Sequence, residues 1–161
     1  MAHIPTAVSE SPALSTIRRI LLWTLVLGAA GTAAELLLVG HYESMAQFVP
    51  LVLLAATVVL GGSVLLTPRP VSLTLLQLLM VIFLGSGLLG VGLHYHGNEE
   101  FELEMYPSLS GLELITKTLT GATPVLAPGS MSLLGIVGLA YTHRHPLHRR
   151  GPRAAFSEEA Q

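Results

Sequence analysis

The chain contains no cysteine and few charged residues. The lack of cysteine excludes disulfides, thiolate nucleophiles, zinc ribbons, iron–sulfur ligation and dithiol redox chemistry. Asp, Glu, Lys and Arg make up 11% of the 161 residues, against roughly 25% in soluble domains. No nucleophile-and-base pattern, phosphate-binding loop or nucleotide fingerprint occurs in the sequence. We therefore expect no catalytic residue and no required cofactor, and nothing in the sequence points to nucleic-acid binding.

Long apolar runs dominate what the chain does contain. A helix needs about 20 consecutive, mostly apolar residues to cross the hydrocarbon core of a bilayer. Four segments meet or approach that length: 20–40, 48–66, 71–93 and 124–141. The sequence predicts an all-α integral membrane four-helix bundle over residues 17–143. A disordered cytoplasmic tail (1–16) precedes this bundle and a basic cytoplasmic tail (144–161) follows it.

The basic residues orient the predicted bundle, because Lys and Arg accumulate on the cytoplasmic side of membrane proteins. With four crossings, one side receives Arg18, Arg19, Arg69, Arg144, Arg149, Arg150 and Arg153. The other side receives only Lys117, together with six glutamates. Both termini are therefore predicted to be cytoplasmic. A cleaved signal peptide at the N-terminus is the competing interpretation, although the apolar run resumes after Glu35.

The connection 94–123 is too long for a simple turn, and loops of that length are usually functional or carry structure of their own. Residues 100–105 alternate charged and apolar side chains, a period of two that predicts an extended segment. Ser110 and Glu113 form a capping-box pattern that opens a short helix ending near Leu119. This helix is predicted to lie on the outer membrane surface or to roof the bundle.

A polar cluster at the outer ends of the first and third spans is the one candidate site. Its members could bind zinc, copper, manganese or iron and are His41, Glu43, His94, His96, Glu99 and Glu100. His94 and His96 would project in similar directions on an extended chain, so this pair works best if the third helix ends at Leu93. Two other interpretations stay open: the aromatic rings anchor the helix ends at the interface, or His41 and His94 hold a haem between them.

Glu35 lies within the first apolar span, where an ionisable group is costly and usually faces a partner or a cavity. It shares a predicted helix face with Gly28 and Gly31, where a neighbouring helix would pack. A protonated Glu35 bonded to that helix, or one wetted at the headgroups, is the structural interpretation. A role in moving a proton, ion or ligand is the functional one.

Several motifs carry a resemblance to a known group of proteins. They are Glu35, His41-Tyr42-Glu43, Gly97-Asn98-Glu99-Glu100-Phe101-Glu102, Tyr106-Pro107-Ser108-Leu109-Ser110-Gly111, Thr120-Gly121-Ala122-Thr123-Pro124 and Leu126-Ala127-Pro128-Gly129. With these the chain resembles a family of small four-helix bacterial membrane proteins with no known activity. The resemblance covers the four spans and the outer loop and implies a bacterial inner membrane. It implies no activity, cofactor or catalytic residue.

Three functions are compatible with the sequence. The first is a structural or accessory subunit without catalytic activity, which binds the lipid bilayer and a membrane-protein partner or a second copy. The second is an outer-face protein that binds a transition metal or haem through the polar cluster. The third is a small transporter that works as a homo-oligomer, since four helices leave little room for a path.

Overall fold

The computed structural model describes residues 11–149, and every regular element within them is a helix. In chain order the elements are α1 (Pro12–Leu38), α2 (Met45–Leu66), α3 (Pro70–Met105), α4 (Gly111–Leu119), α5 (Gly129–Thr142) and α6 (Pro146–Arg149). Most of both predicted tails, residues 1–10 and 150–161, lies outside the described residues. The first helix already begins at Pro12, where the Ser11 hydroxyl accepts a hydrogen bond from the Leu14 N–H.

Three of the helices are long and apolar enough to cross a membrane: α1, α2 and α3. Much of their surface carries exposed large apolar side chains, among them Leu27 on α1 and Val59 on α2. A soluble domain rarely leaves such wide apolar faces uncovered. The prediction of an all-α membrane protein is confirmed at this level.

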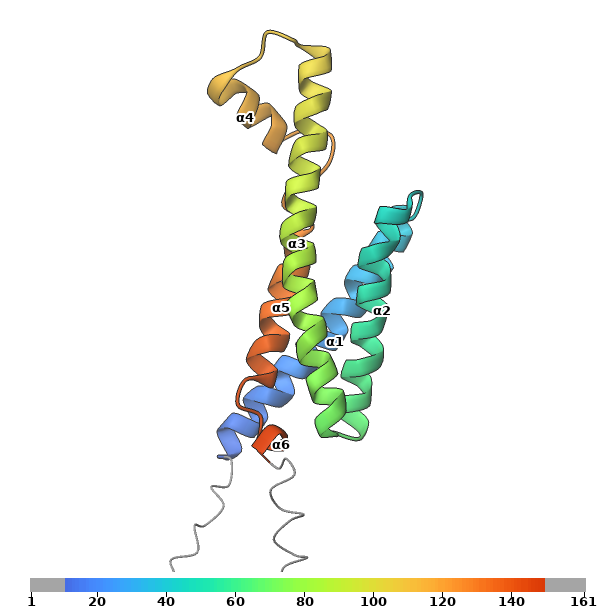
Figure 1. Cartoon of the computed structure of the whole chain (residues 1–161), viewed down its shortest axis with the longest axis vertical. Helices are drawn as coiled ribbons and strands as arrows, with labels where there is room; N and C mark the ends of the chain where they lie inside the picture. Colours follow the sequence, from blue (N-terminus) through green and yellow to red (C-terminus); the bar gives the residue numbers. More distant parts are fainter. Residues whose placement is uncertain (1–10, 150–161) are drawn as a thin grey trace, which may run out of the picture.

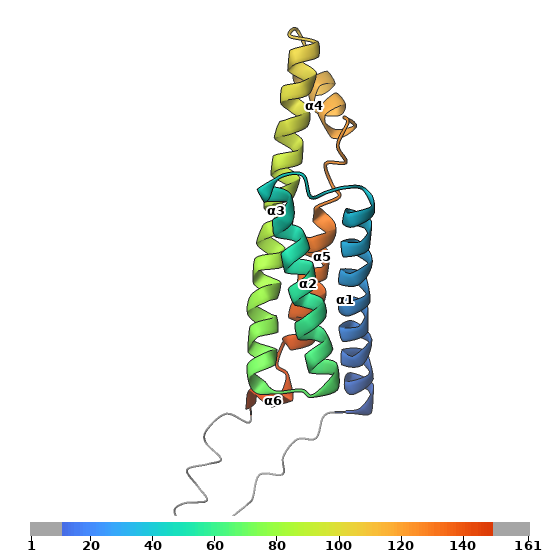
Figure 2. The same ribbon diagram turned by 90° about the vertical axis from the view of Figure 1, so that its right-hand side faces the viewer.

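The helices α1, α2, α3 and α5 run side by side and contact one another in a closed ring, α1 to α2 to α3 to α5 and back to α1 (Figures 1 and 2). The start of α1 and the short α6 lie at one end of this bundle, called here the terminal end. Side chains from all four helices fill the core, including Leu25, Leu54, Phe83 and Met131. Burial of these apolar side chains against one another defines the arrangement of the helices.

The third helix is much longer than a membrane crossing. Its 36 residues extend over about 54 Å at 1.5 Å per residue. Figure 1 shows α3 continuing well past the ends of α1 and α2, with α4 beside the extension. The predictions that this helix ends at Leu93 and that residues 100–105 are extended are therefore wrong. Residues 94–105 of α3 together with α4 form what we call the projecting hairpin, and this end of the molecule is the hairpin end.

The fifth helix begins later than its apolar run predicts. Helix α5 has 14 residues and starts at Gly129 rather than at Pro124. Between them the chain makes successive three-residue turns, in which Ala127 N–H bonds the Pro124 carbonyl at 3.1 Å and Gly129 N–H bonds the Leu126 carbonyl at 2.9 Å. Pro128 precedes the first helical residue, a place where a proline's missing N–H costs nothing. These turns extend the segment that contains α5 further toward the hairpin end.

Glycines let α3 and α5 pack almost backbone to backbone. A Cβ atom at Gly87 would lie 2.6 Å from the Ser132 backbone nitrogen, and one at Gly135 would lie 2.9 Å from the Met80 carbonyl oxygen. The Ser132 hydroxyl also donates a 3.0 Å hydrogen bond to the Leu84 carbonyl oxygen. Such close approach is what small residues provide between membrane helices, and it fixes α5 against the middle of α3.

Candidate functional site

His41 and His94 meet at the hairpin end of the bundle. Gly40 adopts a left-handed conformation (φ +72°) and ends α1, with the His41 N–H bonding the Leu36 carbonyl at 2.8 Å. This turn directs His41 toward α3, where the His94 ring lies with its centroid 6.4 Å from that of His41 and its plane tilted by 52°. Two of the six predicted metal ligands, from distant parts of the chain, are thus neighbours.

The orientation of the His94 ring is fixed by the start of the α5 segment. Its Nδ1 atom lies 3.1 Å from the Pro124 carbonyl oxygen. Because a carbonyl oxygen can only accept, Nδ1 carries the proton of this hydrogen bond. A neutral His94 therefore keeps its lone pair on Nε2, the arrangement that metal-binding histidines usually have.

The other four predicted ligands do not join this pair. His96 is exposed and its Nδ1 lies 3.4 Å from the Glu99 carboxylate, one turn further along α3. Glu43 and Glu100 are exposed as well. Because α3 continues, His94 and His96 project about 160° apart around the helix axis rather than in one direction. Over residues 11–149 no three His, Asp or Glu side chains are placed to hold one metal ion.

Glu35 lies on an exposed face of α1, four residues from the C-cap Val39 and hence about 6 Å from the helix end. Gly28, Gly31 and Glu35, predicted to share one face of α1, do not share their surroundings in the structure. A Cβ atom at Gly28 would lie 2.7 Å from the Leu134 side chain of α5, whereas one at Gly31 would meet no atom within 4 Å. Gly28 therefore packs inside the bundle, while Gly31 and Glu35 face outward together.

Asn98, which sequence reasoning did not single out, holds the projecting hairpin together. It is only 3% exposed. Its Nδ2 atom donates to the carbonyl oxygens of Thr118 (2.9 Å) and Thr123 (2.8 Å). Its Oδ1 atom accepts from the backbone N–H (3.1 Å) and the hydroxyl (2.7 Å) of Thr123. One amide thus joins α3, the end of α4 and the segment that leads to α5.

The hairpin also differs from the sequence expectation at the start of α4. Ser110 is the N-cap residue, but its side chain makes no capping hydrogen bond, so the predicted capping box is not formed. The chain turns instead through Gly111, which adopts a left-handed conformation (φ +62°). Lys117 lies over the ring of Tyr106 at 4.2 Å from Nζ to the centroid, a cation–π contact that ties α4 to the end of α3.

The apolar stripe of α4 faces away from the rest of the molecule. We define this stripe by Leu112, Ile115 and Leu119, which are 83%, 43% and 48% exposed. On the side of α4 that packs against α3, Thr118 is fully buried and its hydroxyl has no hydrogen-bond partner among the described residues. The stripe thus leaves three large apolar side chains uncovered on one helix.

At the terminal end, Arg18 joins α1 to the end of α5. Its side chain is buried, and its guanidinium donates hydrogen bonds to the carbonyl oxygens of Tyr141 (2.5 Å), His143 (3.1 Å) and Arg144 (3.4 Å). These carbonyls would otherwise be left unpaired at a helix C-terminus, where a positive charge is also favourable. Arg18, predicted only as an orienting charge, is therefore a structural residue.

No protein-family model, no curated protein sequence and no solved structure matches the chain.

Proposed function

We propose that the chain is a membrane subunit without catalytic activity of its own, and that it binds a partner protein through the projecting hairpin. The exposed apolar stripe of α4 is the observation that carries this proposal. A nine-residue helix gains little from exposing leucines and isoleucine to water. Asn98 nonetheless holds α4 in the orientation that exposes them. A partner that covers the stripe would remove this apolar surface from water.

The charges of the hairpin define the kind of partner. The helices of the hairpin carry one lysine, Lys117, and five glutamates: Glu99, Glu100, Glu102, Glu104 and Glu113. A complementary partner has an apolar patch rimmed with Lys or Arg, since opposed potentials steer and fix an interface. The same negative charge opposes docking of α4 on an anionic lipid surface.

The proposal includes a membrane orientation. We infer that α5, with the turns before it, is the fourth crossing, that the hairpin is outside and that both termini are cytoplasmic in a bacterial inner membrane. In support, four arginines gather at the terminal end: Arg18 and Arg19 lie in the first turns of α1, Arg69 directly precedes α3, and Arg144 follows α5. This is the distribution that the positive-inside rule describes.

Purification of the full chain in mild detergent tests the partner. We expect one protein to co-purify in a fixed ratio, and its identification should reveal an apolar patch rimmed with basic residues. The double variant Leu112→Asp, Ile115→Asp should lose this partner. Ser108→Asp, which adds a charge in the loop between α3 and α4 and outside the stripe, should keep it. A chain that purifies alone as a folded monomer, or a partner that both variants retain equally, would overturn the proposal.

A second candidate function is binding of a transition metal or haem by His41 and His94. It is supported by the 6.4 Å separation of their rings and by the hydrogen bond that leaves the His94 Nε2 lone pair free. Two histidines supply only part of a metal's ligand set, so water or a partner would supply the rest. Elemental analysis and the absorption spectrum of tag-free protein test it. Metal or haem should fall in His41→Ala and His94→Ala but not in His96→Ala; metal-free folded protein would refute it.

The third hypothesis, a small oligomeric transporter, depends on the outward face of α1 that carries Gly31 and Glu35. A second copy packed there would enclose Glu35 between subunits. Flux across reconstituted vesicles that disappears in Glu35→Gln would support this hypothesis, and vesicles without flux would remove it.

A further inference from the structure

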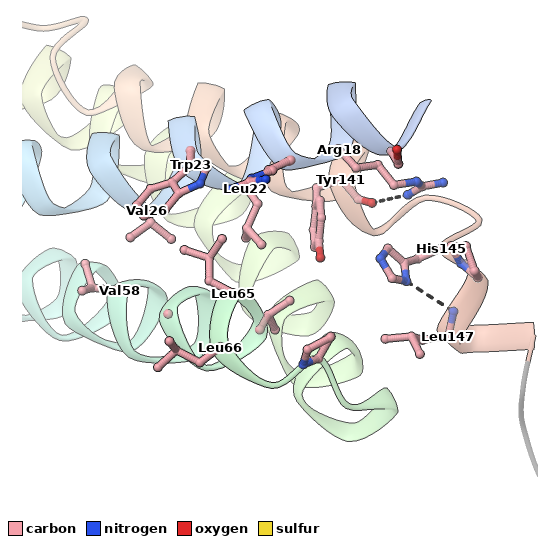
Figure 3. A pocket seen from close by; sticks show the side chains of 16 residues that line it. Arg18, Leu22, Trp23, Val26, Val58, Leu65, Leu66, Tyr141, His145 and Leu147 are labelled. Atoms are coloured by element: carbon pink, nitrogen blue, oxygen red, sulfur yellow. Dashed lines mark hydrogen bonds between the residues drawn. The ribbon is translucent and has the colours of Figure 1, made fainter. Parts of the chain in front are cut away.

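An apolar groove opens between α1 and α2 near the terminal end of the bundle (Figure 3). Its volume is about 790 Å³. Leu22, Trp23 and Val26 of α1 form one wall, and Val58 and Leu65 of α2 form the other. The distance from Arg19 to Val26 along α1 is seven residues, or about 10 Å. Most of the residues that line the groove are apolar, so most of it is suited to hydrocarbon.

The polar side chains of the groove are gathered at one end. Ser15, Arg18 and Arg19 come from the first turns of α1, and His145 comes from the segment after α5. In Figure 3 the guanidinium of Arg18 is directed at the carbonyl of Tyr141. The neighbouring Arg19 is exposed at the mouth of the groove. None of the described residues that line the groove is acidic, so this end is positively charged.

Two adjacent glycines of α2 determine where the groove opens. A Cβ atom at Gly61 would lie 2.6 Å from the Val26 side chain, so α1 and α2 touch at this point. At Gly62, which lines the groove, a Cβ atom would meet nothing within 4 Å. The missing side chain at Gly62 leaves room between the helices that no other part of the described chain fills.

We propose that this groove binds an anionic phospholipid, with one acyl chain between α1 and α2 and the headgroup phosphate at Arg19. The apolar walls match a hydrocarbon chain, and the basic end matches a phosphate that carries net negative charge. Trp23 on the wall suits a position between lipid tails and headgroups. Binding here does not depend on the proposed partner, because the hairpin is at the opposite end of the molecule.

Trp23 provides the probe, because it is the only tryptophan in the chain. Bromine atoms on an acyl chain quench indole fluorescence on contact. The full chain is reconstituted in vesicles that contain increasing fractions of brominated phosphatidylglycerol or brominated phosphatidylcholine. We expect half-maximal quenching at about fivefold lower fraction of the anionic lipid, the ratio expected for one basic side chain beside an anionic headgroup.

Two variants separate the roles of charge and space. Arg19→Gln should abolish the preference for phosphatidylglycerol, whereas Arg69→Gln, which removes an arginine that does not line the groove, should retain it. Gly62→Leu should fill the groove and reduce quenching by both lipids. Its control is Gly85→Leu, because Gly85 also faces open space but belongs to α3. Circular dichroism of each variant shows whether the helices are intact.

Three outcomes would overturn the proposal. Equal quenching by both lipids would mean that only unselective boundary lipid touches Trp23. A preference that survives Arg19→Gln would place the headgroup elsewhere. Quenching by neither lipid would mean that protein fills the groove, either another segment of this chain or a second copy.

Discussion

Asn98 and Thr123, 25 residues apart in the sequence, are joined by three hydrogen bonds. The amide of Asn98 pairs with the backbone N–H, the carbonyl and the hydroxyl of Thr123. Gly121 allows this approach, since a Cβ atom there would lie 2.8 Å from Asn98 Nδ2. The projecting hairpin is therefore held by the hydrogen bonds of Asn98 and by the contact of Lys117 with Tyr106.

Replacement of Asn98 by alanine should release α4 from α3. The change leaves the carbonyls of Thr118 and Thr123 unpaired, and each such loss costs about 1–3 kcal/mol. We expect amide hydrogen exchange over residues 111–123 to become at least tenfold faster, while α1 and α2 stay protected. Gly97→Ala, at the neighbouring exposed position with open space around it, is the control. Unchanged protection of α4 in the Asn98 variant would contradict this account.

Added methyl groups between α3 and α5 should destabilise the bundle. Gly87→Ala and Gly135→Ala force backbone atoms apart, and overpacking of this kind costs roughly 1–3 kcal/mol. Gly85→Ala, with no atom within 4 Å of the new methyl group, should be neutral or stabilising by up to about 1 kcal/mol. Unfolding in mixed micelles with rising dodecyl sulfate, followed by circular dichroism, measures the difference. Similar midpoints for all three variants would refute the close packing of α3 and α5.

Loss of the Arg18 side chain should loosen the end of α5. Hydrogen bonds from charged donors contribute about 1.5–3 kcal/mol when buried, so Arg18→Gln should lower the unfolding free energy by about 2 kcal/mol. The adjacent Arg19→Gln removes the same charge from an exposed position and should change stability by less than about 0.5 kcal/mol. The same detergent titration compares the two. If both variants lower the unfolding free energy equally, the loss of positive charge is responsible, and not the loss of the hydrogen bonds to the end of α5.

The membrane orientation can be tested because the chain has no cysteine. Single cysteines introduced at Glu104, in the hairpin, and at Arg69, in the turn between α2 and α3, give unique labelling sites. With the proposed orientation, an impermeant maleimide labels Glu104→Cys in intact cells. The same maleimide should label Arg69→Cys only after the membrane is permeabilised. The opposite pattern would invert the topology, and labelling of both in intact cells would contradict a membrane crossing by α3 between the two sites.

Run length and hydropathy were sufficient to predict α1, α2 and the membrane part of α3. The hairpin extension was missed because residues 100–105 alternate and because Glu100 and Glu104 lie one turn apart. That repulsion costs only a few tenths of a kcal/mol. Packing of α4 against residues 94–105, with the hydrogen bonds of Asn98, stabilises the extension. Tertiary contact, which the local pattern does not contain, outweighs a weak local preference.

The candidate site was predictable only in part. Placing His41 and His94 at the same end of the bundle was enough to suggest that they could meet, and the structure brings them together. The prediction that His96 lies beside His94 assumed that α3 ends at Leu93. Because α3 continues to Met105, the two side chains project in different directions. No pattern in the sequence marks Asn98 among its polar neighbours, because its importance comes from Thr118 and Thr123, which lie 20 and 25 residues further on.

The length of α3 has a mechanical consequence. One helix without an internal proline joins the projecting hairpin to the terminal end, where it contacts α6. A hydrocarbon core of about 30 Å occupies little more than half of its length of about 54 Å. Rotating such a rod by ten degrees about one end displaces the other end by about 9 Å. With the proposed orientation, a partner that moves the hairpin would therefore also move the end of α3 on the other side of the membrane.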